Sequence, residues 1–339
     1  EQRRCAELHV RSSTPAPSPP LWNGERYGHA RIRVAYLSAD FCEHATAYLM
    51  AGLFECHDRS GFETVAISYG PDDGSPMRAR LARAFDRFVD ARVLPDARIA
   101  RLLRDMEIDI AVDLKGLTTD TRFGILAHRP APVQVAYLGY PGTCGAGFID
   151  YVLADRFVLP EAERRHWTEK VAYLPDCYQV NDAAQSIAAR VPDRAAAGLP
   201  EAGFVFCSFN NSYKILPRLF DVWMRLLRAV PGSVLWLLED NAIARLNLER
   251  EAASRGIDAA RLVFAPRLPH AEHLARHRLA DLFLDTLPVN AHTGASDALF
   301  AGLPLVTCAG KAFAGRVAGS LLHAVGLPEL VVHALPEYE

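Results

Sequence analysis

The stretch Leu279–Pro304, LADLFLDTLPVNAHTGASDALFAGLP, contains one complete strand–turn–helix junction. Its apolar run Asp281–Thr286 is typical of a buried strand with an acidic end, and a helix is predicted to begin at Ala295. The small polar turn between them, Asn290–Gly294, would direct several unpaired backbone N–H groups and the positive end of the helix dipole to one point. An anionic group, typically a phosphate, is the natural occupant of that point.

Side chains in this turn add to the backbone donors. The imidazole of His292 and the hydroxyl of Thr293 can donate hydrogen bonds, and Gly294 lets a ligand approach the backbone closely. Asp297, in the first helical turn, can accept hydrogen bonds from ribose hydroxyls. A simpler interpretation stays open, because an ordinary α/β loop with a good N-cap has the same pattern, and the aspartate would then serve only the helix dipole.

The composition predicts a soluble globular protein of two α/β domains. The chain has 339 residues, half of them hydrophobic, and a net charge of −3. The small net charge gives no general attraction to nucleic acid or to an anionic membrane, so neither is expected as a partner. No apolar run is long enough to span a membrane, and residues 1–10 lack the apolar core of a signal peptide. Nothing in the sequence indicates an oligomeric state.

Cysteine and histidine usage argues for a reduced environment without metal. The seven cysteines are scattered and include no Cys-x-x-Cys pair, which is typical of a cytoplasmic protein. The twelve histidines contain no His-Glu-x-x-His arrangement, so no zinc or other metal site is predicted. The G-x-G-x-x-G and P-loop patterns are also absent, which disfavours dinucleotide-binding and ATPase functions.

Alternating strands and helices predict two Rossmann-like domains, each a doubly wound parallel sheet with helices on both faces. Residues 1–30 are interpreted as a linker or a remnant of an upstream region, since residues 11–24 are rich in Pro and Ser. Residues 31–175 and 203–339 are the two domains, and the Ala-, Pro- and Asp-rich residues 176–202 are the linker between them. Ligands of such folds bind at the carboxyl ends of the strands, so the site is expected in an interdomain cleft.

Predicted strands are apolar runs bounded by turn residues, and they cover 31–38, 63–69, 109–114, 134–138, 151–154, 170–174, 204–209, 233–238, 262–265, 282–285 and 304–308. In the first half, one helix is predicted to begin near Thr46 and a second to extend to Phe88. The other predicted helices cover 99–106, 217–229, 242–255, 270–278, 296–301 and 315–325.

Two further segments of the second domain follow strands. In the loop SFNNSYK, Lys214 can place its charge on a phosphate, and Asn211 can hydrogen-bond to it. On a later helix, His270, His273 and Arg276 share one face, where imidazole and guanidinium groups can stack on a flat base. A solvated lysine and a solvated helix face would produce the same patterns. Taken together with the phosphate-type turn, however, these loops favour a nucleotide diphosphate ligand.

Two loops of the first domain also carry candidates. His44 follows the first strand and is the natural proton-handling group, because histidine titrates near neutrality; the alternative is a histidine of no consequence in a helical first turn. A second loop contains several glycines, which indicate backbone freedom. It can line one wall of the cleft or contact a sugar. Its residues are Gly139, Tyr140, Pro141, Gly142 and Thr143.

Residues 31 to about 332 resemble the catalytic region of the protein O-GlcNAc transferases, including their bacterial relatives. The matching stretches are RIRVAYLSADFCEHATAYL, RPAPVQVAYLGYPGTCGAGFIDYVLAD, FCSFNNSYKI, PGSVLWLL and LADLFLDTLPVNAHTGASDALFAGLPLVT. The resemblance implies a GT-B glycosyltransferase that moves N-acetylglucosamine from UDP-GlcNAc to Ser or Thr hydroxyls of proteins. It also implies inversion at the anomeric carbon and no requirement for a metal or other cofactor.

The resemblance assigns a role to each candidate. Lys214 corresponds to the lysine that binds the diphosphate and stabilises the leaving UDP, and His44 to a histidine at the reacting end that was once proposed as the base. The remaining donor-side correspondences are His292, Thr293 and Gly294 for the diphosphate loop, Asp297 for the ribose, His273 with Arg276 for packing on uracil, and the backbone of Leu268 for the uracil edge.

The sequence also departs from the family. Asn211 stands where the animal enzymes carry Gln, Gly294 replaces a second Thr, and His270 replaces a Lys near the ribose. The tetratricopeptide repeats and the C-terminal helical segment are not found in these residues, so we expect a fragment of a longer protein. The alternatives are a SPINDLY-like O-fucosyltransferase that uses GDP-fucose, a nucleotide-binding homologue without activity, and a sugar-nucleotide epimerase on the same fold.

Overall fold

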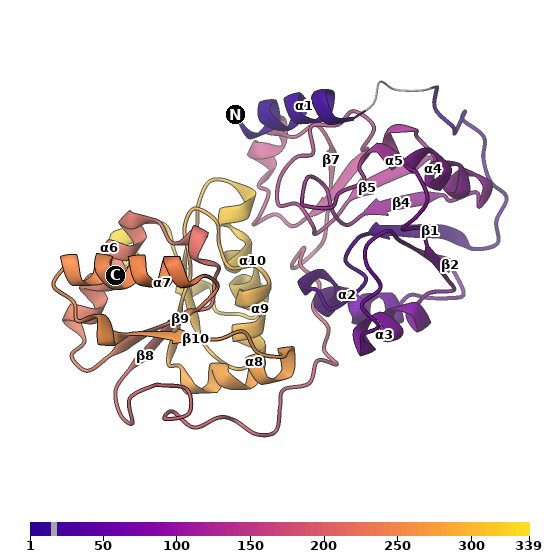
Figure 1. Ribbon diagram of the computed structural model, residues 1–339. Coiled ribbons are helices and arrows are strands. Elements are labelled where there is room, and N and C mark those ends of the chain that lie inside the picture. The colour runs from indigo at the N-terminus through magenta and orange to yellow at the C-terminus, as the bar shows by residue number, and fades with distance from the viewer. Residues whose placement is uncertain (15–18) are drawn as a thin grey trace. The chain divides into compact units, whose positions relative to one another are not determined.

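The computed structural model describes residues 1–14 and 19–339, which form two compact units, Glu1–Ala184 and Gln185–Glu339 (Figure 1). Each unit is an α/β domain built on a parallel sheet, which confirms the predicted fold class. The division between the units falls within the segment 176–202 that the sequence suggested as a linker.

The sheet of the first unit has the strand order β3-β2-β1-β4-β5-β6-β7. Its strands are β1 Ile32–Ser38, β2 Phe62–Ser68, β3 Arg87–Asp90, β4 Ile110–Asp113, β5 Val133–Ala136, β6 Tyr151–Ala154 and β7 Lys170–Tyr173. Its helices are α1 Gln2–Ser13, α2 Ala45–Glu55, α3 Pro76–Ala84, α4 Asp96–Asp105 and α5 Gly124–Ala127. The order reverses between β1 and β4, so the loops that follow these two strands flank the switch point where α/β proteins bind ligands.

The sheet of the second unit has the order β10-β9-β8-β11-β12-β13 and reverses between β8 and β11. Its strands are β8 Val205–Ser208, β9 Val234–Leu238, β10 Leu262–Ala265, β11 Leu282–Leu284, β12 Leu305–Cys308 and β13 Val331–Val332. Its helices are α6 Pro217–Ala229, α7 Ala242–Ser254, α8 His270–Arg276, α9 Thr293–Phe300, α10 Val317–Ala324 and α11 Leu335–Tyr338. The core of this unit includes Trp223 of α6, which is 1% exposed.

The structure corrects one predicted helix. The helix expected to extend to Phe88 ends at Ala84, and Phe88 lies in β3, which pairs in parallel with β2. Phe88 packs edge-on to Phe41 at 5.9 Å between ring centroids, within a cluster of aromatic side chains. Aromatic packing against the sheet therefore overrides the helical pattern of the preceding residues. The short elements β3, α5, β13 and α11 were not predicted.

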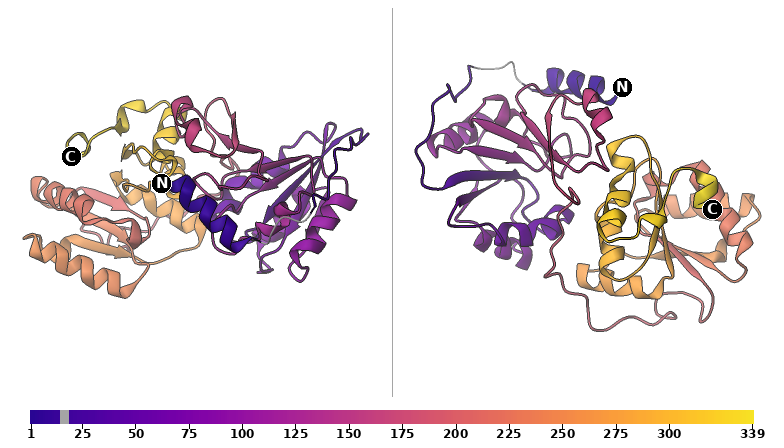
Figure 2. Two further views of the ribbon diagram at one scale, coloured as in Figure 1. Left: turned by 90° about the horizontal axis from the view of Figure 1, so that it is seen from above. Right: turned by 180° about the vertical axis from the view of Figure 1, so that it is seen from behind.

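Helix α1 packs on the loop that follows β5, and Figure 2 shows it beside the 3-10 turn Glu161–His166. Ala6 is buried in this contact. Gly145 of the loop has a φ of +66°, and a Cβ added there would lie only 2.4 Å from the backbone nitrogen of Glu7. Gly145 thus combines a left-handed backbone with a close approach that a side chain would block.

We expect Gly145→Ala to lower the free energy of unfolding by about 1–3 kcal/mol, because it forces both a strained φ and a clash with α1. Gly147→Ala is the matched control, since a Cβ at Gly147 meets nothing within 4 Å. Urea denaturation compares the two variants, and limited proteolysis reports whether α1 has detached. Equal stability of both variants would contradict this account of Gly145.

Candidate active site

The turn between β11 and α9 is organised by the carboxylate of Asp285, which is 1% exposed. Its Oδ1 accepts hydrogen bonds from the backbone nitrogens of Thr286 at 2.7 Å and Ala291 at 2.6 Å. Its Oδ2 accepts one from the hydroxyl of Thr307 on β12 at 2.6 Å. Burial raises the pKa of Asp285 to about 7. One buried side chain therefore closes the turn and ties it to the neighbouring strand.

Lys214 reaches this turn from the loop after β8. Its Nζ donates to the carbonyl of Asn290 at 2.7 Å and to Oδ1 of Asn210 at 3.4 Å. Desolvation lowers the pKa of Lys214, while the nearby Asp285 acts in the opposite direction. The predicted lysine loop and the predicted phosphate-type turn therefore meet at the carboxyl ends of two paired strands, β8 and β11.

The start of α9 provides backbone donors, as predicted, and it begins at Thr293, two residues before the expected start. The first intrahelical hydrogen bonds run from Ala295 and Ser296 to the carbonyl of His292, so the N–H groups of Thr293 and Gly294 precede the helical ladder. The nearest atom to a Cβ built on Gly294 is Cβ of Ala291 at 4.0 Å. Packing inside the protein therefore does not require a glycine at position 294.

The imidazole of His292 is engaged within the protein. Its Nε2 lies 3.1 Å from the carbonyl of Ala314, and burial lowers its pKa to about 4. Because a carbonyl can only accept, Nε2 carries the proton and Nδ1 is an acceptor in the neutral ring. The donor that the sequence suggested for a ligand is thus used to attach the turn to the segment before α10.

Phe209 directly follows β8 and contacts two of the predicted base-binding residues of α8. The guanidinium of Arg276 lies 4.4 Å from the Phe209 ring centroid, and the ring of His273 lies 5.5 Å from it. Arg276 is 2% exposed and donates to the Pro266 carbonyl. His270, the third residue of the predicted face, bonds instead to Gln185 at 2.6 Å.

His273 links this cluster to α9. Its Nδ1 accepts from Arg276, so the proton of the neutral ring is on Nε2, which lies 3.8 Å from Oδ2 of Asp297. Burial lowers the pKa of His273 to about 2 and raises that of Asp297 to about 7. The structure thus brings together the two residues assigned to the base and the ribose.

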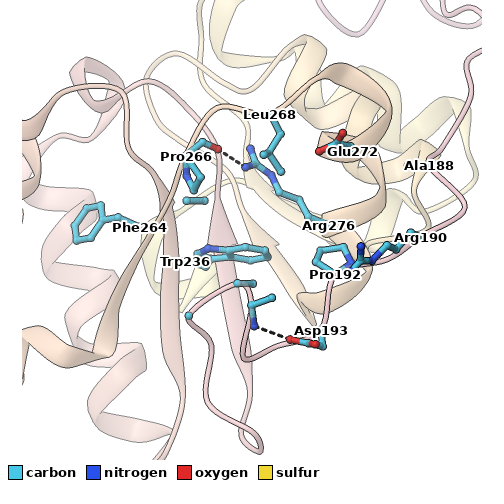
Figure 3. Close-up of a pocket in the computed structure, with 14 residues that line it drawn as sticks. Ala188, Arg190, Pro192, Asp193, Trp236, Phe264, Pro266, Leu268, Glu272 and Arg276 are labelled. Atoms are coloured by element: carbon cyan, nitrogen blue, oxygen red, sulfur yellow. Dashed lines mark hydrogen bonds between the residues drawn. The ribbon is translucent and has the colours of Figure 1, made fainter.

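A pocket of about 670 Å³ opens in the second unit beside α8 (Figure 3). Of the predicted donor-binding residues, Leu268 and Arg276 line it, together with Trp236 of β9. Nε1 of Trp236 and Nε of Arg276 are buried without a hydrogen-bond partner among the described residues.

Asn211 does not line this pocket. Its Oδ1 accepts a hydrogen bond from Arg267 at 3.2 Å. The loop that carries both Asn211 and Lys214 is closed by Asp240, whose carboxylate accepts from the backbone of Ser212 at 2.7 Å. Neither Asp240 nor Phe209 was identified from the sequence, although Phe209 is the last residue of the predicted strand 204–209 and Asp240 lies two residues after the predicted strand 233–238.

In the first unit, the loops after β1 and β4 bring together three charged or titratable side chains. Nζ of Lys115 lies 3.0 and 2.9 Å from the two carboxylate oxygens of Asp40. Nδ1 of His44 lies 3.5 Å from Oδ2 of Asp40 and accepts a hydrogen bond from the backbone of Thr46 at 3.2 Å. Lys115 was not identified from the sequence, although it follows a predicted strand.

The glycine-containing loop of the first unit is shaped by close packing. A Cβ on Gly139 would lie 2.0 Å from the carbonyl oxygen of Leu114, and one on Gly142 would lie 2.0 Å from the side chain of Gln2 in α1. The hydroxyl of Thr143 donates to Glu169 at 2.7 Å. These contacts account for the glycines without a ligand, and the predicted role in sugar binding stays a prediction.

Two doubly wound parallel-sheet units, each with polar loops at its switch point, define a GT-B glycosyltransferase fold. A solved structure of a mutant Thermobaculum terrenum O-GlcNAc transferase matches with a TM-score of 0.88 and 32% identity, over 99% of this chain and 64% of that one. Residues 21–191 and 187–339 match glycosyl transferase family 41, and the chain belongs to that family. The resemblance found in the sequence is thereby confirmed.

Two curated plant relatives extend this result. The probable UDP-N-acetylglucosamine–peptide N-acetylglucosaminyltransferase SEC of Arabidopsis thaliana is 37% identical over 318 residues, covering 92% of this chain and 32% of the relative. The probable UDP-N-acetylglucosamine–peptide N-acetylglucosaminyltransferase SPINDLY of Arabidopsis thaliana is 31% identical over 332 residues, covering 95% of this chain and 36% of the relative. The chain thus spans about a third of the length of these relatives.

None of the helices in residues 1–14 and 19–339 has the length and apolar character needed to cross a membrane. The same residues contain no group of three or more His, Cys, Asp or Glu side chains arranged to hold a metal ion.

Replacing Asp285 should separate its hydrogen-bonding role from its charge. We expect Asp285→Ala to cost about 1–3 kcal/mol of unfolding free energy for each partner left buried and unsatisfied. Asp285→Asn should cost much less, because the amide can accept from the two backbone nitrogens and donate to Thr307. Chemical denaturation of both variants measures the difference, and equal losses would contradict the assigned role.

The pH dependence of stability tests the state of the same carboxyl group. Because the pKa of Asp285 is raised to about 7 in the folded protein, against about 3.9 in an unfolded chain, the fold binds this proton more tightly. The resulting stabilisation is fully present below about pH 4 and is lost as the pH rises towards 7. The stability of the wild type relative to Asp285→Asn should therefore fall over that range, by at most about 1.4 kcal/mol per pH unit.

Proposed function

We propose that this protein transfers N-acetylglucosamine from UDP-GlcNAc to Ser or Thr hydroxyls of acceptor proteins, with inversion and without a metal or other cofactor. Membership of glycosyl transferase family 41 and the names of its relatives support this reaction. The single observation that carries the proposal is the contact of the Lys214 ammonium with the carbonyl of Asn290, in the turn that leads into α9. It joins a cation to a helix N-terminus at one point, where a diphosphate would be bound.

In this reaction the acceptor hydroxyl oxygen bonds to the anomeric carbon while the bond from that carbon to the diphosphate breaks. The hydroxyl proton is released and UDP leaves with the bonding electrons. Negative charge grows on the diphosphate, and Lys214 with the N–H groups at the start of α9 would stabilise it. An ammonium has three N–H donors, and the contacts of Lys214 with Asn290 and Asn210 use two of them, so one is left for a phosphate oxygen.

We assign the uridine to the side of α8. Asp297 would accept ribose hydroxyls through its carboxyl oxygens. It lies in the second turn of α9, not in the first as the sequence suggested, and its Oδ2 is 3.8 Å from Nε2 of His273. The pocket lined by Leu268, Trp236 and Arg276 would receive the base, because aromatic and guanidinium groups can stack on its flat ring. His270 and Asn211 would complete the donor site by releasing their present partners, Gln185 and Arg267.

Calorimetric titration of the whole chain with UDP, UDP-GlcNAc and GDP-fucose tests this proposal. We expect binding of the two uridine nucleotides, no binding of GDP-fucose, and transfer of GlcNAc to acceptor protein detected by mass spectrometry. Binding of GDP-fucose alone would favour a SPINDLY-like fucosyltransferase. UDP binding without transfer or hydrolysis would identify a nucleotide-binding homologue, and release of a changed sugar without any acceptor would identify an epimerase.

Removing the lysine tests the electrostatic part of the mechanism. We expect Lys214→Ala to reduce kcat about 10²–10³-fold, the usual effect of losing one donor to a developing anion. Lys170→Ala is the control, because that lysine lies on β7 of the first unit. Circular dichroism verifies that both variants fold. Transfer by Lys214→Ala at the rate of the control would refute the assignment of the diphosphate site.

A further inference from the structure

A buried ion pair occupies the switch point of the first sheet. The side chains of Lys115 and Asp40 are only 6% and 12% exposed, and Nζ contacts both carboxylate oxygens. A buried pair of this kind adds little net stability, since desolvating the two charges offsets most of their attraction. Its position at the carboxyl ends of β1 and β4 therefore calls for another explanation, and the neighbouring His44 provides one.

The protonation state of the His44 ring follows from its hydrogen bond. Nδ1 accepts from the backbone N–H of Thr46 at 3.2 Å, which caps the start of α2. A backbone amide only donates, so Nδ1 must be the nitrogen without a proton. The neutral ring then carries its proton on Nε2. The side chain is 45% exposed, so a ligand can reach it.

The ion pair explains why this state persists beside a carboxylate. Oδ2 of Asp40 lies 3.5 Å from Nδ1 of His44, and an unpaired carboxylate there would attract a proton to Nδ1. The ammonium of Lys115 neutralises that carboxylate. Partial burial and Lys115 lower the pKa of His44 while Asp40 raises it, and the net shift is downward. These are the charged groups on the two loops that act on His44, and together they favour the neutral ring.

We propose that His44 serves the transfer reaction as a neutral N–H donor through Nε2, not as the proton acceptor, and that Asp40 and Lys115 are positioning residues that hold it in this form. Its partner is an oxygen atom of the bound substrates, either on the sugar nucleotide or on the acceptor peptide. The assignment of that partner rests on the proposed function. The form of the ring follows from this chain's own contacts.

Nuclear magnetic resonance of the ¹⁵N-histidine-labelled full chain tests the form of the ring without any activity. His44→Gln identifies the resonance. We expect the Nε2–H tautomer and a pKa below the usual value of about 6.5. Lys115→Met should raise the pKa of His44, and Lys115→Arg should restore it, because arginine keeps the charge. An Nδ1–H tautomer in the wild type, or a pKa that does not respond to Lys115→Met, would overturn the proposal.

A double variant covers the case in which Lys115→Met does not fold. Asp40→Asn with Lys115→Met removes both charges together, so the burial cost of an unpaired carboxylate does not arise. We expect His44 to keep a low pKa in this variant, because the group that attracts a proton is gone. A raised pKa there would show that the pair does not act through charge, and this result would also overturn the proposal.

Kinetics of two His44 variants separate a donor from a base. The Gln side chain can donate through its amide but cannot take up a proton, whereas Phe can do neither. We expect His44→Gln to keep at least about a tenth of kcat/KM and His44→Phe to lose about 10²-fold or more, the usual contribution of a positioned catalytic group. Equal losses of 10²-fold or more in both variants would indicate a base and overturn the proposal.

The Michaelis constants then identify the bound oxygen. A rise in KM for UDP-GlcNAc alone in His44→Phe assigns it to the sugar nucleotide, and a rise for the acceptor peptide alone assigns it to the acceptor. Absence of GlcNAc transfer by the wild type would refute the proposed function, while the tautomer and pKa of His44 would still be measured independently.

Discussion

The carboxylate of Asp285 is the interaction on which the candidate site of the second unit depends. It bonds the two ends of the turn between β11 and α9 and ties that turn to Thr307 on β12. Because the turn is closed in this way, the carbonyl of Asn290 lies where the ammonium of Lys214 can reach it. A buried carboxyl group thus sets the position of a cation more than 70 residues earlier in the chain.

The two units hold together the loops at their switch points in similar ways. Each parallel sheet reverses its strand order once near its centre, at β1/β4 in the first unit and at β8/β11 in the second. At both places the loops diverge and expose backbone and side-chain polar groups that the sheet cannot satisfy. A lysine then joins the two loops: the buried Lys115 contacts Asp40 in the first unit, and the half-buried Lys214 contacts Asn290 in the second.

Three histidines at these sites share a physical property. His44, His273 and His292 each use one ring nitrogen in a hydrogen bond inside the protein, and burial lowers the pKa of each. In all three the proton is assigned to Nε2, from a backbone amide, a guanidinium and a carbonyl respectively. Neutral rings with a fixed tautomer provide directed donors and acceptors without the repulsion that a positive charge would exert on Lys214 or Lys115.

Much of the fold followed from local pattern. Buried parallel strands are nearly continuous apolar runs, so the strand Leu262–Ala265 was predicted with the bounds that the structure has. The helix Pro217–Ala229 was also predicted with its observed bounds, from its helical pattern of apolar residues. The family was recognisable for the same reason, because its motifs lie in contiguous stretches. Elements as short as Val331–Val332 escaped prediction, since two residues have no periodicity to recognise.

The sequence by itself determined which loops follow which strands, and it placed Lys214 and the turn before α9 at carboxyl ends of parallel strands. The pairing of β8 with β11, which brings the two together, belongs to the tertiary structure. Only the tertiary structure decided how the polar groups are paired. The partner of Lys115 lies 75 residues away and that of His292 lies 22 residues away, distances at which no sequence spacing specifies contact. Hydrogen bonds and desolvation act through space, so the lowered pKa of His292 follows from the packing of the loops that bury it.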